Sequence, residues 1–400
     1  MDIIQRIRQF NAGRDPERLA LKYRRMREGP FIFLRASCHL FQDRLTELGA
    51  MPAAPLAWLC GDLHLENFGS YKGDNRLVYF DLNDFDEAAL GPVTRELVRF
   101  LASVLVGAES LGSNQRQALE LCAAFLDGYA GALAEGKARW VERDTADGLV
   151  ADLLKSARKR SRSRLLDSRT ELSGSKRRIR IDGAKALPAS DSQRSRVTAF
   201  MEEFAARQPA PRFFRPLDVA RRISGNGSLG VERYIILVQG RGSPDGNYLL
   251  DLKAAQPSSL LPHLAARQPP WESEAERVVA VQRRMQAISM AFLHPVRLDG
   301  HSCVLRALQP SEDRVDLSAC SGRQKRLAGL VRTMGEIVAW GQLRSSGRDG
   351  SALADALIDF GTHPVWRGEL IELARLCAAA VREDWATYCA AYDDGAFRSD

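Results

Sequence analysis

The spacing of apolar and polar residues divides the first third of the chain into helical stretches and two short strands. Residues 1–50 carry Arg and Lys between apolar positions at helical spacing, and residues 92–134 show the same period strongly. Apolar runs at 56–60 and 76–81 predict strands, separated by a polar loop and by a turn at 73–75. This part of the chain is therefore expected to be mostly helical.

The pattern changes after a proline-rich stretch at 207–218, which predicts a linker. The next residues, ARRISGNGSLGVERYIILVQG and NYLLDLKAAQ, predict three strands with a hairpin turn at 243–246. A helix of about twenty residues is expected from Ser273, with Glu276 completing a capping box, to about Phe292. The remaining expected elements are two strands within 294–310 and helices at 322–344, 351–359 and 365–391.

The composition adds bounds on size and compartment. A chain of 400 residues usually forms two or three lobes, and 45% hydrophobic and 27% charged residues are ordinary for a soluble protein. No apolar run approaches the roughly 18 residues of a membrane span, and the N-terminus has no signal-peptide pattern. Seven cysteines without C-x-x-C spacing favour reduced thiols. We therefore expect a cytoplasmic protein without a membrane segment.

The net charge of +7 is concentrated in the segment Lys155–Lys185. One interpretation is a nucleic-acid patch, and the other is a solvated basic helix followed by a hairpin around residues 182–183. No aromatic residue occurs between Trp140 and Phe200, so base-stacking platforms are missing from this segment. Nucleic acid is therefore the disfavoured partner, and phosphorylated small molecules or acidic partners account for the charge at least as well.

The sequence CGDLHLENFG, at 60–69, is the first candidate site. In phosphoryl transfer, Asp62 could accept the proton of an acceptor hydroxyl and Asn67 could ligate Mg²⁺. Asp62 and His64 could instead hold a catalytic metal in a hydrolase. A polar loop closed by its own Asx turns is the structural alternative.

A second candidate site follows the expected strand within VYFDLNDFDEAALGP, at 78–92. Clustered carboxylates repel one another unless a cation joins them, and oxygen ligands favour Mg²⁺. A solvated acidic turn is the alternative. The acids concerned are Asp81, Asp84, Asp86 and Glu87.

The third candidate site is GNGSLGV, at 225–231, with Gly225, Gly227, Ser228 and Gly230. A G-x-G-x-x-G in a dinucleotide-binding fold leads into a helix. Here a strand-like sequence follows, which favours a strand–turn–strand flap over phosphates.

Lys253 lies in the next expected strand, where its ammonium could pair with the α- and β-phosphates of a nucleotide. Lysine is almost never buried without a partner. One of Glu272, Glu274 and Glu276 could pair with it, although capping of their own helix explains these acids equally well.

With these residues, the sequence resembles the protein-kinase-like superfamily, and most closely its aminoglycoside-phosphotransferase branch. G-D-L-H-x-x-N resembles the catalytic loop of that branch, which implies Asp62 as base and Asn67 as magnesium ligand. The strand ending at 84–86 resembles the D-F-G or I-D-W metal element, and its spacing to Gly91 favours Asp84 over Asp81. The flap glycines and Lys253 resemble the small lobe.

The order of these motifs differs from that of kinases, because the glycines follow the catalytic loop by about 160 residues. A circular permutation would keep the same site, since the termini of compact domains often lie close together. The expected fold is thus α+β: a permuted, bilobal kinase-like fold with a helical large lobe and a small antiparallel lobe containing one helix. The expected parts are 1–150 (large lobe with both loops), 151–214 (basic segment and linker), 215–310 (nucleotide-binding lobe) and 311–400 (rest of the large lobe). Within these, VLRALQP, at 304–310, would be the hinge strand, and 327–343 resembles the helix that leads into the catalytic loop.

A more specific resemblance is to a bacterial family of unknown function, through P-F-x-F-L-R at 30–35, N-D-F-D-E at 83–87 and G-x-G-S-L-G. This resemblance covers most of the chain and supplies no substrate. Two positions depart from expectation: Cys60 stands where many phosphotransferases have histidine, and Ala254 stands where an acid is expected.

These features predict a Mg²⁺-dependent, ATP-utilising phosphotransferase that acts on a hydroxyl of an unidentified acceptor. Asn67 and Asp84 would hold the metal, with Asp86 or Asp81 as a secondary ligand, and Arg35 and the arginines near residue 22 are candidates for the acceptor pocket. The open alternatives are a nucleotide-binding pseudokinase that acts as a scaffold, a metal-dependent hydrolase, and a basic nucleic-acid-binding protein.

Overall fold

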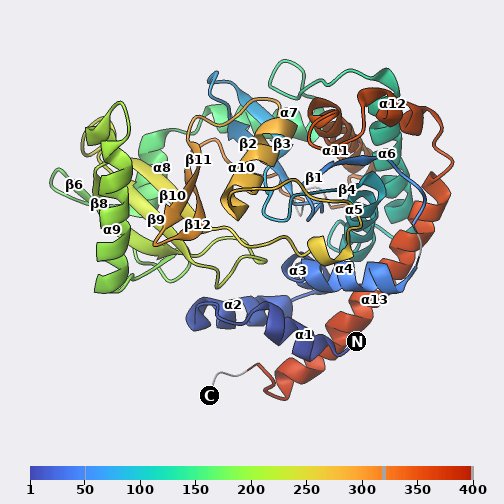
Figure 1. The fold of residues 1–400 in the computed structure, drawn as a ribbon, viewed down its shortest axis with the longest axis horizontal. Coiled ribbons are helices and arrows are strands. Elements are labelled where there is room, and N and C mark those ends of the chain that lie inside the picture. Colours follow the sequence, from blue (N-terminus) through green and yellow to red (C-terminus); the bar gives the residue numbers. More distant parts are fainter. Residues whose placement is uncertain (50, 318–320, 398–400) are drawn as a thin grey trace.

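A six-stranded sheet and a bundle of helices form the two halves of the molecule (Figure 1). The computed structural model describes residues 1–49, 51–317 and 321–397. The helical half has one large hydrophobic core, and the two faces of the sheet have separate, smaller cores. This arrangement confirms the predicted α+β class, with small antiparallel sheets.

Long helices that pack against one another build the helical half. α6 packs along α11, and α5, buried over its whole length, packs along α13. The bounds are α1 Ile3–Phe10, α2 Pro16–Met26, α3 Pro30–Ala36, α4 Cys38–Glu47, α5 Val93–Gly107, α6 Gln115–Glu135, α7 Gly148–Arg158, α11 Gln324–Ser345, α12 Ala354–Thr362 and α13 Arg367–Asp393. These helices agree with the expected helical stretches. Within the described ranges, no helix is both long and apolar enough to span a membrane.

The large sheet has the strand order β11-β12-β10-β9-β8-β7, and all its pairs are antiparallel. Its strands are β7 Ala186–Leu187, β8 Pro216–Arg222, β9 Arg233–Val238, β10 Tyr248–Ala254, β11 Leu293–Leu298 and β12 His301–Ala307. α9 (Asp191–Ala206) covers the outer face (Figure 1). Because successive side chains on a strand point to opposite faces, Leu250 and Leu252 meet α9, whereas Leu249, Asp251 and Lys253 face the other way.

The five strands expected between 215 and 310 all form, and the turn at 243–246 joins β9 to β10. The helix between the third and fourth strands, α10 (Glu274–Met285), is shorter than expected and lies between the two halves (Figure 1). It ends where Gln286 turns to an extended backbone. The side chain of Gln286 donates to the Leu82 carbonyl at 2.7 Å, so this stretch of chain bonds to the helical half instead of extending the helix.

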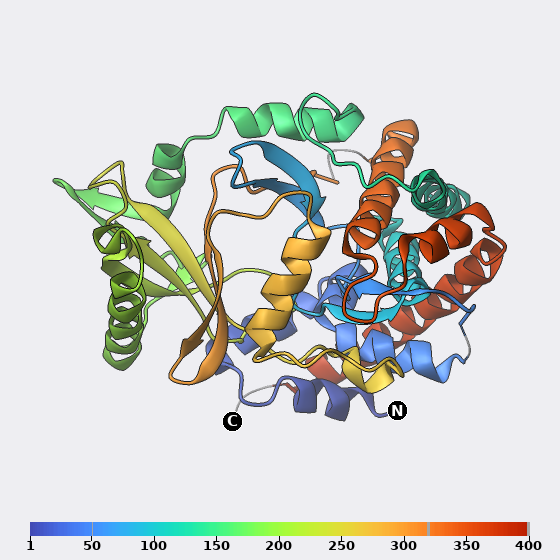
Figure 2. The same ribbon diagram turned by 45° about the horizontal axis from the view of Figure 1, so that its top comes forward.

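The segment expected to be a linker packs onto the sheet. After the short helix η1 (Pro211–Phe214), β8 begins at Pro216. Upstream, α8 (Arg162–Arg169) and the hairpin of β5 (Thr170–Ser173) and β6 (Lys176–Ile179) cover the inner face, with Leu166 and Ile179 in its core. The expected hairpin at 182–183 is instead a turn into β7, in which Asp182 accepts three backbone hydrogen bonds. α7 and α8 lie along one side of the molecule, from the helical half to the sheet (Figure 2).

Four short strands near the start of the chain carry the candidate loops. β1 (Leu56–Leu59) pairs with β4 (Ala89–Pro92), and β2 (Phe68–Lys72) pairs with β3 (Val78–Leu82). β2 and β4 were not predicted, because FGSYK and ALGP are short, contain glycine and lack a clear alternating pattern.

Candidate functional site

The loops at 60–67 and 83–88 face each other because both of their ends are paired. The first loop starts after β1 and ends at β2, and the second starts after β3 and ends at β4. The pair Leu59–Ala89 fixes one end of both loops, and the pair Phe68–Leu82 fixes the other. The strand pairing therefore brings the two acidic motifs of the sequence together.

Gly61 allows the two loops to touch. Its φ of 87° lies in the left-handed region, and a Cβ built on it would overlap the carbonyl of Glu87. Any other residue would therefore be strained and would push the loops apart.

Asn67 ties the loops together with its buried side chain, which is 1% exposed. Its Nδ2 donates to the backbone carbonyls of Asp62, at 3.0 Å, and Asp84, at 3.3 Å. Its Oδ1 accepts from the backbone N–H of Asp84 at 2.9 Å. One lone pair of this amide oxygen therefore remains for another ligand.

Asp62 points into the cleft with 22% of its side chain exposed, and Arg99 holds it. The guanidinium of Arg99 is fully buried on α5 and donates from Nε to Asp62 Oδ1 at 2.6 Å. His64 lies beside this pair, with its Nε2 4.0 Å from Asp62 Oδ2. Burial lowers the pKa of His64 well below its usual range, so the ring is neutral, and its Nδ1 accepts from the Glu66 N–H at 3.1 Å. These contacts give His64 a role in shaping the loop.

The three aspartates of the second motif separate into different positions. Asp84 is exposed in the cleft, and its Oδ1 accepts from the backbone N–H of Asp86 at 3.3 Å. Asp86 forms an ion pair with Lys253. Asp81 is 3% exposed and accepts from the Ala287 N–H at 2.9 Å, outside the cleft. The expectation that Asp81 could serve as a secondary metal ligand is therefore not met, because its carboxylate is bonded inside the core.

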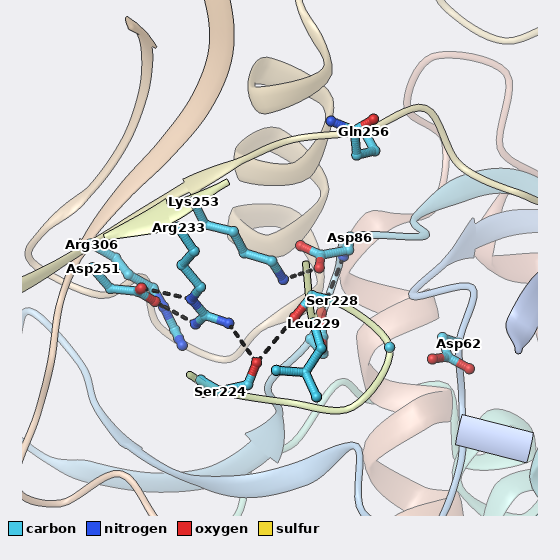
Figure 3. A network of polar contacts seen from close by, with 12 residues as sticks. Asp62, Asp86, Ser224, Ser228, Leu229, Arg233, Asp251, Lys253, Gln256 and Arg306 are labelled. Carbon is cyan, nitrogen blue, oxygen red and sulfur yellow. Dashed lines mark hydrogen bonds and ion pairs between the residues drawn. The ribbon is translucent and has the colours of Figure 1, made fainter. Parts of the chain in front are cut away.

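Lys253 reaches the second loop from β10, a sequence separation of 167 residues (Figure 3). Its partner is Asp86 and not an acid of α10. Glu276 accepts from the backbone N–H of Glu272 at 2.7 Å, and Glu274 pairs with Arg277 at 2.7 Å. The expectation that Glu276 binds nucleotide through Lys253 is wrong, because these acids bond at the start of their own helix.

The glycine loop connects β8 to β9 and rests on the N-terminal helices. The carbonyl of Gly227 accepts from Arg14 Nη1 at 2.8 Å and from Lys22 Nζ at 3.0 Å. The carbonyl of Gly230 accepts from the Asp15 N–H at 2.8 Å. Burial lowers the pKa of Lys22 well below its usual range and that of Arg14 to about 10. The loop is therefore a fixed wall of the cleft.

The cleft has two adjoining compartments, of about 720 and 480 Å³. They share Arg35, Asp84, Asp86, Gly225, Asn226, Ser228, Lys253 and Arg314. The smaller one adds Asp62, His64, Asn67, Gly227 and Gly230. Figure 3 shows the glycine loop passing between Lys253 and Asp62. Every candidate residue except Asp81 and the three acids Glu272, Glu274 and Glu276 thus lies in one cleft.

Several residues of the site were not predicted as such: Arg99, Arg14 and Lys22. Arg99 stands on the apolar helix α5 and Lys22 on α2, whereas Arg14 lies in the turn between α1 and α2. A basic residue in such places is usually solvated, so the sequence carries no local signal. Arg35 borders both compartments, and its suggested place in an acceptor pocket stays a prediction.

The donor set suits a magnesium ion that is held largely by its ligand. Among the described residues, no group of three His, Cys, Asp or Glu side chains could enclose a metal. Asp84 and Asp86 instead offer two carboxylates in the open cleft, beside the amide of Asn67. Mg²⁺ is commonly bound by one or two carboxylates together with waters and substrate phosphates, and these residues fit that pattern.

The fold and the cleft define a mixed α+β protein with a charged cleft between a helical half and an antiparallel sheet. The chain belongs to the family DUF2252, described as an uncharacterized protein conserved in bacteria, whose model matches residues 14–391. This confirms the predicted membership of a bacterial family of unknown function. No curated protein and no solved structure matches the chain.

Proposed function

We propose that this protein is a Mg²⁺-dependent phosphotransferase that uses ATP and acts on a hydroxyl-bearing acceptor, on a circularly permuted kinase-like fold. One observation carries the proposal: Lys253 of the sheet pairs with Asp86 of the acidic loop, in the cleft that also contains Asp62. Residues so far apart in sequence converge on one cleft, and they are the residue types that phosphoryl transfer requires.

The order of elements in the sheet half supports the permuted fold. The glycine loop joins β8 to β9, the lysine lies on β10, and α10 separates this strand from β11 and β12. This is the arrangement that the resemblance implies for a small lobe. α11, the helix expected to lead into the catalytic loop, packs against β1, from whose end that loop starts. A permuted chain would keep this neighbourhood although the connection runs elsewhere.

The residues of the cleft divide the work of phosphoryl transfer. Asp62 would orient the acceptor hydroxyl and take its proton, and Arg99 fixes the direction of the carboxylate. Lys253 would neutralise charge on the α- and β-phosphates after leaving Asp86. Asp84 and the free lone pair of Asn67 would hold Mg²⁺, which supplies charge neutralisation at the β- and γ-phosphates. The reaction would depend on the positioning of the reactants and on the neutralisation of phosphate charge, and it would need no covalent intermediate on the protein.

A nucleotide-binding protein without transfer activity is the second candidate. The amide oxygen of Asn67 already accepts from Asp84, and Arg99 already occupies one oxygen of Asp62. Both groups are thus engaged within the protein, which suits a site that binds nucleotide without turning it over.

Nucleotide binding can be tested by thermal unfolding with Mg-ATP. A ligand at 100 times its Kd stabilises by about 2.7 kcal/mol, so we expect a rise of several degrees in Tm. Lys253→Met and Asp84→Asn should lose most of this rise. Lys137→Met and Asp74→Asn, exposed residues outside the cleft, are the matched controls and should keep it.

Phosphate release from ATP, measured for the wild type and Asp62→Asn, separates the two candidates. Release that depends on Asp62 supports transfer, whereas a rise in Tm without release supports the binding protein. Equal rises in Tm for the wild type and both cleft variants would refute the proposed site.

A further inference from the structure

The basic segment, which composition left without a role, forms one wall of the larger compartment. α8 and the β5–β6 hairpin fold over the inner face of the sheet. The cationic side chains of the segment Lys155–Lys185 that line the cleft are Arg160, Arg164, Arg169, Arg180 and Lys185. Neighbours in the same segment, such as Arg158 and Arg178, are exposed and do not line the cleft. The segment therefore contributes a distinct subset of its charges to the compartment.

The opposite wall is the sheet itself, and it carries a buried cluster of three arginines around one carboxylate. Asp251 is 1% exposed and accepts from Arg233 at 2.8 and 2.5 Å (Figure 3). Arg222 Nη1 lies 2.5 Å from the same carboxylate, and Arg306 Nε lies 3.3 Å from it. Two of these arginines line the compartment with partly exposed side chains, Arg222 at 14% and Arg306 at 19%. Burial and its like-charged neighbours lower the pKa of Arg222 to about 10.

The compartment as a whole has a large surplus of positive charge. Twelve lysine and arginine side chains line it, against six carboxylates. Within the described ranges, Arg164, Arg169 and Lys185 have no ion pair with a carboxylate. Like charges held together in a partly desolvated space repel, and an anion that enters would relieve the repulsion. Guanidinium groups also match phosphate oxygens in geometry and bind them in pairs.

We propose that the larger compartment is a phosphate-binding subsite that takes the phosphate groups of a small molecule. The subsite adjoins the groups of the proposed function, because Asp84, Asp86 and Lys253 border both compartments. Its role in catalysis rests on that proposed function, which it deepens. A phosphate held by the arginines would hold the rest of its molecule beside the reacting groups. These phosphates belong either to a phosphorylated acceptor or to the nucleotide itself.

Inorganic pyrophosphate, titrated calorimetrically without Mg²⁺ or nucleotide, is the probe for this subsite. The double variant Arg164→Gln/Arg169→Gln removes two cleft charges, and Arg158→Gln/Arg178→Gln removes two charges of the same segment outside the cleft. We expect Arg164→Gln/Arg169→Gln to weaken pyrophosphate binding at least about tenfold, since each substituted arginine loses charge-assisted hydrogen bonds to the phosphate. The second should change binding by no more than about twofold, because salt screens distant exposed charges. Equal weakening in both variants, or no binding by the wild type, would overturn the subsite.

Nucleic acid is tested in the same series with a single-stranded oligonucleotide. The proposal would be overturned in favour of a nucleic-acid-binding surface patch by two results together. The oligonucleotide would bind more tightly than pyrophosphate, and both double variants would lose this binding equally. Both double variants replace exposed or half-exposed side chains, so we expect them to fold, and circular dichroism checks that they do. Arg222→Gln tests the buried wall and should also weaken pyrophosphate binding.

The source of the phosphate is resolved by adding a saturating non-hydrolysable ATP analogue with Mg²⁺. Pyrophosphate that still binds beside the analogue identifies the subsite with a second, phosphorylated molecule. Pyrophosphate that is displaced identifies it with the phosphates of the nucleotide. Asp62→Asn, which lies outside the larger compartment, should abolish phosphate release and leave pyrophosphate binding unchanged. Failure of the phosphotransferase proposal would therefore leave the subsite intact, and failure of the subsite would appear in the arginine variants alone.

Discussion

Replacing Asp251 with asparagine tests the charge balance of the sheet wall. The substitution keeps the shape of the side chain and removes the one negative charge among Arg222, Arg233 and Arg306. The pKa of Asp251 is held well below its usual range, chiefly by these three guanidiniums against the effect of burial, so the group is charged at neutral pH. Its contribution to stability is present at pH 7 and would be lost only as the pH falls through that depressed pKa.

The expected cost follows from what each arginine would keep. Arg306 retains Glu312, at 3.1 Å, and Arg233 retains a hydrogen bond to the Ser224 carbonyl at 3.4 Å. Arg222 keeps no other carboxylate partner in the described structure. Removing one partner from a buried ion pair costs about 3–5 kcal/mol. Because two of the three arginines keep a partial partner, we expect about 4 kcal/mol.

Urea unfolding at pH 7, followed by far-ultraviolet circular dichroism, measures this cost. Asp127→Asn is the matched control, since Asp127 also lies between two arginines, Arg367 at 2.8 Å and Arg332 at 3.4 Å, but is 44% exposed. An exposed pair of this kind contributes about 1 kcal/mol or less. A loss for Asp251→Asn within about 1 kcal/mol of the control would refute the reasoning. Added phosphate should restore part of the lost stability if the adjoining compartment binds it.

Two further predictions concern the support of the loops. Gly61→Ala should destabilise the protein by more than the about 1–2 kcal/mol of positive-φ strain alone, since the added Cβ would overlap Glu87. Gly300→Ala is the control, because Gly300 has a φ of 79° and open space around it, so its substitution gives the strain without the overlap. Equal urea midpoints for the two variants would contradict the close approach of the loops at Gly61. Burial raises the pKa of Glu96 to about 7. The contribution of its protonated carboxyl to the stability of the folded protein is therefore fully present below about pH 4.5 and is lost as the pH rises through 7. The free energy of unfolding should therefore fall by up to about 3 kcal/mol between pH 5 and 8, and Glu96→Gln should flatten that fall, which a variant with the wild-type pH profile would contradict.

The local signals of the sequence were sufficient for the long helices, for five of the six strands of the large sheet and for the loops that carry chemistry. The loops that carry Asp62, Asn67 and Asp84 each follow a short apolar run, and such runs predict strands that end at a polar loop. The glycine loop is recognisable because a strand pattern lies on both sides of Gly225–Gly230. These features depend on neighbours in the sequence.

The partners of charged residues depend on the fold and could not be predicted. Lys253 has acids nearby in sequence at the start of α10, yet it pairs with Asp86, which lies 167 residues away. Asp81 and Asp84 are three positions apart, yet Asp81 lies within β3, where its carboxylate bonds to the Ala287 N–H, whereas Asp84 lies in the loop after β3 and reaches the cleft. The basic segment likewise has no periodicity that would reveal its wall of the compartment.

The alternation of β10 connects the phosphate subsite to the proposed chemistry. Asp251 and Lys253 are two residues apart on the same face, which is roughly 7 Å along a strand. The arginines around Asp251 and the ammonium of Lys253 therefore form one continuous cationic strip under the sheet, and the acids of the second loop lie at one end of it. A nucleotide base placed on this face would contact charged groups, whereas successive phosphate groups along it would each lie near a cationic side chain. This arrangement supports the proposed phosphate subsite, and competition by a nucleotide analogue decides whether one molecule or two would supply the phosphates.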